Sequence, residues 1–305
     1  MNTEAKMNTG EKIMTRPSTN TVLVTGATGS TGSFLIRLLE EQGVAARAMV
    51  RHERDKARMG DTSASIVIGD FDDADSVAAA LDGVDSAYLV TPSSDKAEAQ
   101  QIRFAELAAE AGVKRLVKLS QFAADEASPV RFLRYHATVE RRIRELGLGY
   151  TFLRPNLFFQ GFLAFKPMIA NDRRFFAPIG DALVSAVDVR DIAQVAVVAL
   201  TEPRHTGKTY TITGPAAVSH AEIARAIAEA IGRDVTFVEI APEVFSGALR
   251  NFGTPEWQVE GLIEDYAHYA RGEAAEAHPT VREVTGREPR DVTAFARDYA
   301  SAFIS

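Results

Sequence analysis

Short apolar runs alternate with amphipathic segments over the first half of the chain. Runs without polar alternation are typical of strands that are covered on both faces. The predicted strands are Thr21–Thr25, Ala45–Val50, Ser65–Ile68, Ala87–Val90, Arg115–Leu119 and Tyr150–Leu153. Helical patterns lie between them, at Phe34–Glu41, Asp73–Leu81, Lys96–Ala111 and Val130–Leu146. Strands and helices that alternate with short connections predict an α/β fold with a doubly wound parallel sheet.

The pattern changes after residue 154. Residues 156–170 are rich in aromatic side chains, and the chain beyond Val218 is mostly helical. Further predicted elements are strands at Val184–Val187, Thr209–Thr213 and Val235–Glu239, and a helix at Asp188–Leu200. We therefore expect residues 20–154 and 184–213 to form a nucleotide-binding domain. Residues 155–183 and 214–305 would form a smaller, mainly helical substrate lobe, and residues 1–19 a disordered extension.

Composition and charge exclude several classes of protein. The 305 residues include 34 Lys plus Arg and 41 Asp plus Glu, a net charge of −7, which argues against direct nucleic-acid binding. The absence of cysteine excludes disulfides and thiolate chemistry. The six histidines show no metal-binding spacing, so we expect no metal site. No apolar run is long enough to span a membrane, and the first twenty residues lack a signal-like apolar region, so we expect a cytoplasmic protein.

The strongest local motif is Thr-Gly-Ala-Thr-Gly-Ser-Thr-Gly at Thr25–Gly32. It follows the first predicted strand and begins the first predicted helix. Its glycines permit a tight turn and a close approach of the backbone to a pyrophosphate, which the helix N-terminus would bind. A glycine-rich turn without a ligand is the alternative. The residues expected to bind a dinucleotide are Gly26, Thr28, Gly29, Ser30, Thr31 and Gly32.

The end of the second predicted strand indicates which dinucleotide is bound. Arg51 stands there, and an arginine suits the 2′-phosphate of NADPH. Glu53 could instead bind the ribose of NADH, so NADPH is favoured over NADH without excluding it. Further cofactor contacts are expected from residues at or near the ends of later strands: Asp70, Phe71, Thr91, Ser120 and Pro155. For Asp70 and Ser120, turn or helix capping is the alternative.

The whole set of motifs resembles the NmrA-like branch of the atypical short-chain dehydrogenases. The glycine motif and Arg51 carry the resemblance, together with later segments in the same order. Those segments are His136–Glu140, Tyr150–Asn156, Val187–Ile192, Gly207–Tyr210 and Val284–Pro289. The resemblance implies a Rossmann-like fold. It also implies either an NADPH-dependent reductase of quinones, azo dyes or triphenylmethane dyes, or a regulator that binds NADP(H) without turnover.

The chain departs from the wider superfamily at the catalytic helix. Tyr135 has Val139 four residues later, so the usual Tyr-x-x-x-Lys pair is missing. By the resemblance, His136 occupies the lysine position and Phe132 the tyrosine position. Without that pair, we expect hydride transfer only to an acceptor that is already strongly electrophilic. His136 is the first candidate for a proton donor, ahead of Tyr135, although a lone helical histidine is often structural.

The substrate side is expected to follow the sixth strand. Asn156 could bind a substrate oxygen or cap a helix. Phe158 and Phe159 could form the wall of an aromatic site or belong to the core, and Gln121 and Trp257 are further substrate candidates. The expected function is an NADPH-dependent reductase of a small aromatic or quinone-like acceptor. The alternatives are an NADP(H)-sensing regulator and a sugar-nucleotide epimerase or dehydratase. The sequence leaves the oligomeric state open, with a homodimer as one alternative.

Overall fold

A computed structural model describes residues 20–304 of the chain, so the extension expected at residues 1–19 lies outside the described residues. The described chain forms a seven-stranded parallel sheet in the order β3-β2-β1-β4-β5-β6-β8. The strands are β1 (Val22–Val24), β2 (Ala46–Val50), β3 (Ser65–Ile68), β4 (Ser86–Leu89), β5 (Arg115–Leu119), β6 (Gly149–Pro155) and β8 (Lys208–Ile212). The predicted α/β fold with a parallel sheet is confirmed.

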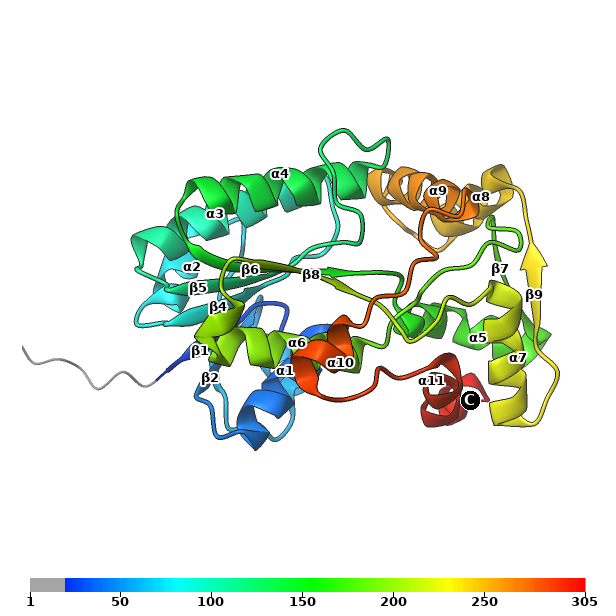
Figure 1. The fold of residues 1–305 in the computed structure, drawn as a ribbon, viewed down its shortest axis with the longest axis horizontal. Helices are drawn as coiled ribbons and strands as arrows, with labels where there is room; N and C mark the ends of the chain where they lie inside the picture. Colours follow the sequence, from blue (N-terminus) through cyan, green and yellow to red (C-terminus); the bar gives the residue numbers. More distant parts are fainter. Residues whose placement is uncertain (1–19, 305) are drawn as a thin grey trace, which may run out of the picture.

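Helices cover both faces of this sheet (Figure 1). On one face lie α2 (Ala74–Leu81), α3 (Ala97–Glu110) and α4 (Arg131–Glu145). On the other lie α1 (Ser30–Glu41), α6 (Val189–Thr201) and α10 (Thr280–Thr285). Alternation along each strand supplies both cores: Val22 and Val24 pack toward α1 and α6, whereas Leu23 packs toward α2 and α3.

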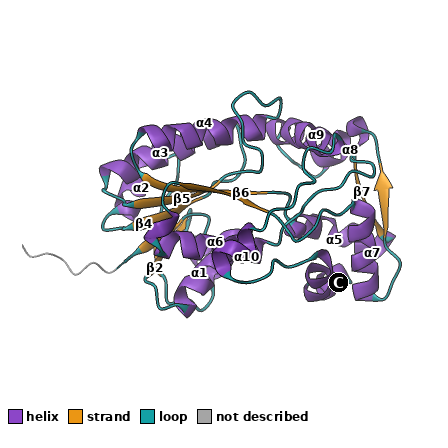
Figure 2. Cartoon of the chain, in the orientation of Figure 1, coloured by secondary structure: helices purple, strands orange, loops and turns teal. Residues whose placement is uncertain are grey.

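A second group of elements lies beyond one end of the sheet (Figure 2). It contains a two-stranded parallel sheet, β7 (Arg174–Ala177) and β9 (Thr236–Glu239). Its helices are α5 (Lys166–Asp172), α7 (His220–Ile231), α8 (Pro242–Asn251), α9 (Glu256–Ala270) and α11 (Val292–Asp298). Short 3₁₀ helices occur at Glu53–Met59, Phe159–Phe165, Pro203–His205 and Ala300–Phe303. Within residues 20–304, no helix combines the length and apolar character that a membrane span requires.

Two local expectations differ from the structure. Residues 184–187 form only isolated bridges, Val184 with Val218 and Val187 with Phe158, so the strand predicted there is wrong. Each bridge has a different partner, which prevents a continuous ladder. Strand β7 was not expected, because its sequence has no alternating pattern and its partner β9 lies about sixty residues away. Thus short strands that depend on distant partners leave little local signal.

His220 is a buried polar residue in the core of the second group. It begins α7 and lies among the rings of Phe162, Phe237 and Tyr266, with neither ring nitrogen hydrogen-bonded. Burial lowers the pKa of His220 to about 4. The unfolded chain therefore binds a proton that the folded chain rejects at pH values between about 4 and 6.5.

Because the pKa of His220 is depressed, we expect the folded state to lose stability as the pH is lowered. Between pH 7 and pH 5, His220 should lower the free energy of unfolding by about 2 kcal/mol. His220→Phe should remove that part of the pH dependence, and His52→Phe, at an exposed histidine, should retain it. Urea denaturation at pH 5, 6 and 7 measures the difference. Equal pH dependence in wild type and His220→Phe would contradict the assignment.

Candidate active site

Two adjoining cavities follow the carboxyl edge of the sheet. One, of about 490 Å³, lies beyond β1, β2 and β3, and the other, of about 460 Å³, lies beyond β4, β5 and β6. Val90, just after β4, lines both cavities. The chain winds outward from β1 to β3 and then returns to β4 on the opposite side of β1. Such a reversal of strand order opens a crevice where open α/β sheets bind ligands.

The glycine motif forms a tight turn between β1 and α1. Gly26 has φ +59°, and a Cβ there would lie 2.6 Å from Cγ1 of Val90. A Cβ on Gly32 would lie 2.2 Å from the carbonyl oxygen of Gly26, so only glycine lets α1 begin this close to the turn. Helix α1 thus begins directly after the turn, and the backbone N–H groups of its first turn have no partner within the helix. Among the motif residues, Gly26 and Thr28 line the first cavity directly.

Charged side chains of both signs surround the first cavity. The Nε atom of Arg51 donates to Asp70 at 2.9 Å, which leaves the other guanidinium nitrogens free to bind a ligand. A backbone hydrogen bond from Asp72 and the guanidinium of Arg51 hold the pKa of Asp70 below its ordinary value. Phe71 also lines this cavity and packs against Phe104 with ring centroids 5.8 Å apart. The expected cofactor-binding residues at the ends of the first three strands thus meet in one place.

The second cavity collects most of the remaining candidates. Its lining includes Thr91, Ser120, Gln121, Tyr135, His136, Pro155, Asn156 and Phe158. It also includes Leu262, Gln258 and Tyr269, which α9 contributes from the second group of elements. Among the described residues that line this cavity, none is Lys, Arg, Asp or Glu. The cavity is therefore apolar and aromatic, with a few neutral polar groups.

Not every expected substrate residue reaches this cavity. Phe159 is buried in the core and stacks on Phe295 at 5.4 Å. Trp257 packs behind the wall, with its ring centroid 6.1 Å from that of Tyr135. Neither side chain lines the cavity, because each is turned toward a core cluster. A role for them in binding an acceptor would act through their neighbours.

Asn156 lines the second cavity, yet both hydrogens of its amide group are already engaged. Its Nδ2 donates to Ser185 Oγ at 2.8 Å and to the carbonyl of Ala274 at 2.9 Å, and its Oδ1 accepts from Leu157 N. The amide thus anchors two distant segments beside the cavity. Donation from Nδ2 to a substrate oxygen would require one of these hydrogen bonds to break, because both amide hydrogens are in use.

His136 contacts a lysine that the sequence reasoning did not select. Its Nδ1 lies 2.7 Å from Nζ of Lys118, and both side chains are buried. Burial lowers the pKa of Lys118 to about 7, and burial together with the nearby lysine lowers the pKa of His136 well below its usual value. The ring of Tyr135 lies beside that of His136 at 4.1 Å, and the Tyr135 hydroxyl is 3.4 Å from Ser93 Oγ.

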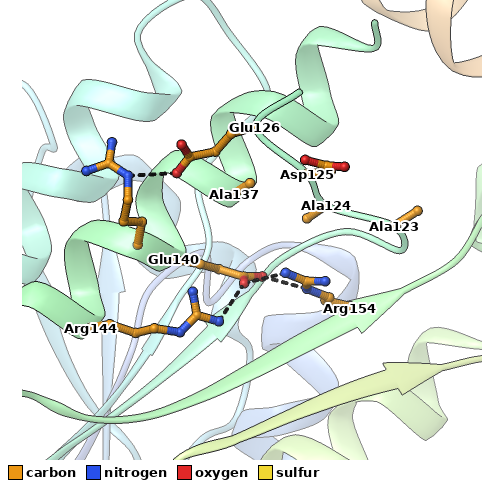
Figure 3. A pocket seen from close by; sticks show the side chains of 9 residues that line it. Ala123, Ala124, Asp125, Glu126, Ala137, Glu140, Arg144 and Arg154 are labelled. Carbon is orange, nitrogen blue, oxygen red and sulfur yellow. Dashed lines mark hydrogen bonds and ion pairs between the residues drawn. The ribbon is translucent and has the colours of Figure 1, made fainter. Parts of the chain in front are cut away.

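The buried carboxylate of Glu140 links α4 to the neighbouring strands (Figure 3). Glu140 accepts from Ser120 Oγ at 2.6 Å and from two nitrogens of Arg154 at 2.9 and 2.6 Å. Arg144 donates to the same carboxylate at 3.3 Å. Beyond these groups lies an outer pocket that also contains Glu126, so the polar network extends from the cavity side of β5 to the surface of α4. Ser120 thus binds Glu140 and caps no helix.

A second buried carboxylate supports the opposite wall. Asp265 on α9 accepts from Gln121 Nε2 at 3.1 Å and from the Tyr269 hydroxyl at 2.8 Å. Burial raises the pKa of Asp265 to about 6. Because Gln121 and Tyr269 direct hydrogens toward Asp265, they present acceptor oxygens to the cavity. The wall formed by β5 and α9 thus favours hydrogen-bond donors and disfavours anions.

Comparison with known proteins agrees with this geometry. The sequence matches the NmrA-like family over residues 18–295. This chain belongs to the NmrA-like family. The family and the Rossmann-like fold expected from the motifs are confirmed.

Three relatives are especially informative. The chain is 36% identical to an NAD(P)H azoreductase of Xenophilus azovorans, over 92% of this chain and 99% of the relative. It is 35% identical to a (4-alkanoyl-5-oxo-2,5-dihydrofuran-3-yl)methyl phosphate reductase of Streptomyces griseus, with the same coverage. The crystal structure of a Citrobacter triphenylmethane reductase complexed with NADP(H) matches with TM-score 0.80 and 25% identity, over 92% and 99% of the two chains.

The sequence reasoning missed Lys118, Glu140 and Asp265. Lys118 interrupts an apolar strand, and a charged residue in the centre of a strand covered on both faces is a signal of function. Glu140 lies four residues after His136 and therefore on the same helix face. Asp265 left no such signal, because its burial depends on how α9 packs against β5. Within residues 20–304, no group of side chains has the arrangement of a metal site.

The network around Glu140 predicts a clear effect on stability. Glu140→Gln removes the charge that compensates Arg154, so the free energy of unfolding should fall by about 3–5 kcal/mol. Glu145→Gln, at an exposed position on the same helix, is the matched control and should cause a much smaller loss. Urea denaturation of both variants measures this. Similar losses in the two variants would show that Glu140 is not the compensating charge.

Proposed function

We propose that this chain is an NADPH-dependent reductase that transfers hydride to a small, electron-poor aromatic acceptor such as a quinone or a dye. Its family and its relatives at 36% and 35% identity make it an NAD(P)H-dependent oxidoreductase. The observation that carries the finer proposal is the pair of adjoining cavities at the carboxyl edge of the sheet. The pair has a glycine turn at one end and a neutral, aromatic cavity at the other.

The first cavity fits a dinucleotide. The turn at Gly26 and the start of α1 offer backbone N–H groups for the pyrophosphate. The helix can begin this close to the turn because Gly32 has no side chain. Arg51 keeps free guanidinium nitrogens for a 2′-phosphate, and Asp70 and Phe71 lie beside the expected adenosine position. When bound, such a cofactor would supply a hydride, and the protein would supply position and orientation.

The second cavity fits an acceptor that is flat and carries no negative charge. Tyr135, Phe158 and Tyr269 provide aromatic surface, and the carboxylate of Asp265 lies behind the wall. A phosphate-bearing substrate like the one named for the Streptomyces relative would find no cationic side chain among the described lining residues. We therefore favour neutral or cationic acceptors over anionic ones.

The alternative function is a regulator that binds NADP(H) and turns nothing over. Such a protein needs the first cavity only. The separate cavity of about 460 Å³ beside His136 favours an enzyme. A homodimer, a cytoplasmic location and the absence of nucleic-acid binding stay predictions. The assignment of residues to two domains is likewise our proposal.

The acceptor class can be tested directly. NADPH should be oxidised when a naphthoquinone or an uncharged azo dye is added, as followed by absorbance. A sulfonated form of the same dye should show kcat/KM lower by about tenfold or more, because the Asp265 wall repels anions. Asp265→Asn should narrow that difference. Tight NADPH binding without oxidation by any acceptor would refute the reductase and support the regulator.

The preference for NADPH depends on Arg51. Arg51→Ala should raise KM for NADPH by about tenfold to a hundredfold, the loss expected for hydrogen bonds to a charged group. KM for NADH should change by no more than about threefold, because the missing contact is to a group that NADH lacks. Arg54→Ala is the matched control, since Arg54 is exposed and lies outside both cavities. A parallel rise of KM for both cofactors in Arg51→Ala would show that Arg51 does not recognise the 2′-phosphate.

A further inference from the structure

Lys118 is the only lysine that is buried within residues 20–304. Its Nζ lies 2.7 Å from His136 Nδ1 and 3.2 Å from the carbonyl oxygen of Leu119. No carboxylate of the described chain lies within salt-bridge distance of it. A buried ammonium without a paired anion is costly, and such groups concentrate at functional sites.

The sheet explains why Lys118 meets His136. Alternation along β5 directs Lys118 and Ser120 to the face that α4 covers, and His136 and Glu140 lie one helical turn apart on α4. Ser120 bonds Glu140, and Lys118 bonds His136. Glu140 is committed to Ser120, Arg154 and Arg144. Among the side chains of residues 20–304, Lys118 therefore hydrogen-bonds only to the histidine.

The contact determines where the proton of His136 lies. A neutral imidazole carries one N–H, and a charged lysine can only donate to an unprotonated nitrogen. With Lys118 at Nδ1, the proton of the ring stands on Nε2. No hydrogen bond to Nε2 occurs within the described residues, and His136 lines the second cavity. Nε2–H is thus the donor available to a molecule in that cavity.

We propose that Lys118 positions His136 with Nε2–H toward the acceptor and supplies a proton to Nδ1 when Nε2–H is donated. This inference rests on the proposed reductase function. A quinone or an azo bond that has taken up hydride, with its two electrons, gains a basic oxygen or nitrogen. The Nε2 proton moves to that atom, and a proton of Lys118 moves to Nδ1, so the imidazole remains neutral throughout.

The cycle closes without any further reactant. After the step, Lys118 is a neutral amine and His136 carries its proton on Nδ1. Once the product leaves, a solvent proton entering through the cavity reaches Nε2, and the Nδ1 proton returns to Lys118. The overall reaction consumes one hydride from the reduced nicotinamide cofactor and one proton from water, which balances the reduction of a quinone or an azo bond by two electrons.

The first test uses the protein without cofactor. In ¹⁵N-histidine NMR spectra, assigned with His136→Gln, the wild-type imidazole should be neutral with its proton on Nε2. Lys118→Met should lose this tautomer preference, whereas Lys114→Met, at an exposed lysine just before β5, should keep it. A wild-type proton on Nδ1, or an unchanged Nε2–H signature in Lys118→Met, would overturn the proposal.

The second test separates positioning from proton supply. Lys118→Gln keeps a donor for Nδ1 but cannot release a proton, so it should retain the Nε2–H tautomer while kcat falls by about tenfold or more. In wild type, kcat should decline as the pH rises through the pKa of Lys118, about 7. That decline should be absent from Lys118→Gln, and KM for the cofactor should not change. Persistence of the decline in Lys118→Gln would refute proton supply.

Other titratable groups near this pair could also affect the pH dependence of kcat. Their effect is removed by comparing the pH profile of Lys118→Gln with that of wild type. Glu140 and Arg154 act on the pair directly, and the ring of Tyr135 lies beside His136. Arg144 reaches the pair only through Glu140, and Asp265 only through Tyr135. All are unchanged in Lys118→Gln. If Lys118→Met does not fold, the tautomer of wild-type His136 still tests positioning, and the pH profile of Lys118→Gln still tests proton supply. The NMR arm needs no turnover, so failure of the proposed reductase activity is distinguishable from failure of the lysine–histidine pair.

Discussion

The second cavity depends on the burial of Glu140. Its carboxylate is removed from water and is compensated by the bidentate guanidinium of Arg154, which joins α4 to β6. The same carboxylate holds Ser120 at the end of β5. A buried charge tolerates little displacement, because any lost hydrogen bond leaves it unpaired. This constraint sets how α4 lies on the sheet and therefore where His136 stands, one turn earlier.

Helix α9 and the residues that follow it close the second cavity on the side away from the sheet. Helix α9 contributes Tyr269 and the buried Asp265, and residues near Ala274 receive hydrogen bonds from Asn156 and Ser185. Farther along, Arg290 pairs with the buried Asp191 of α6. The C-terminal chain thus returns to the face of the sheet that α6 and α10 cover (Figure 1). The second cavity is consequently assembled from both parts of the chain.

Charged groups with few compensating partners gather at this cavity. Lys118 lacks a carboxylate, and Asp265 lacks a cation among the described residues. Each is held by neutral hydrogen bonds, and burial shifts the pKa of each toward neutrality. Such arrangements cost stability and are retained where chemistry uses them. Under the proposed function, the wall with His136 donates a proton and the wall with Asp265 presents acceptor oxygens.

The sequence by itself determined the parallel sheet and the glycine turn, and it selected Arg51 as a cofactor-binding candidate and His136 as a proton-donor candidate. These inferences depend on local periodicity, on residues adjacent to strand ends and on the family resemblance. Only the tertiary structure decided which side chains meet. Lys118 reaches His136 through strand alternation combined with the placement of α4. Phe159 and Trp257 turn away from the cavity because their rings pack against Phe295 and Phe132, respectively. Contacts between distant segments depend on packing geometry, and local sequence patterns carry little information about it.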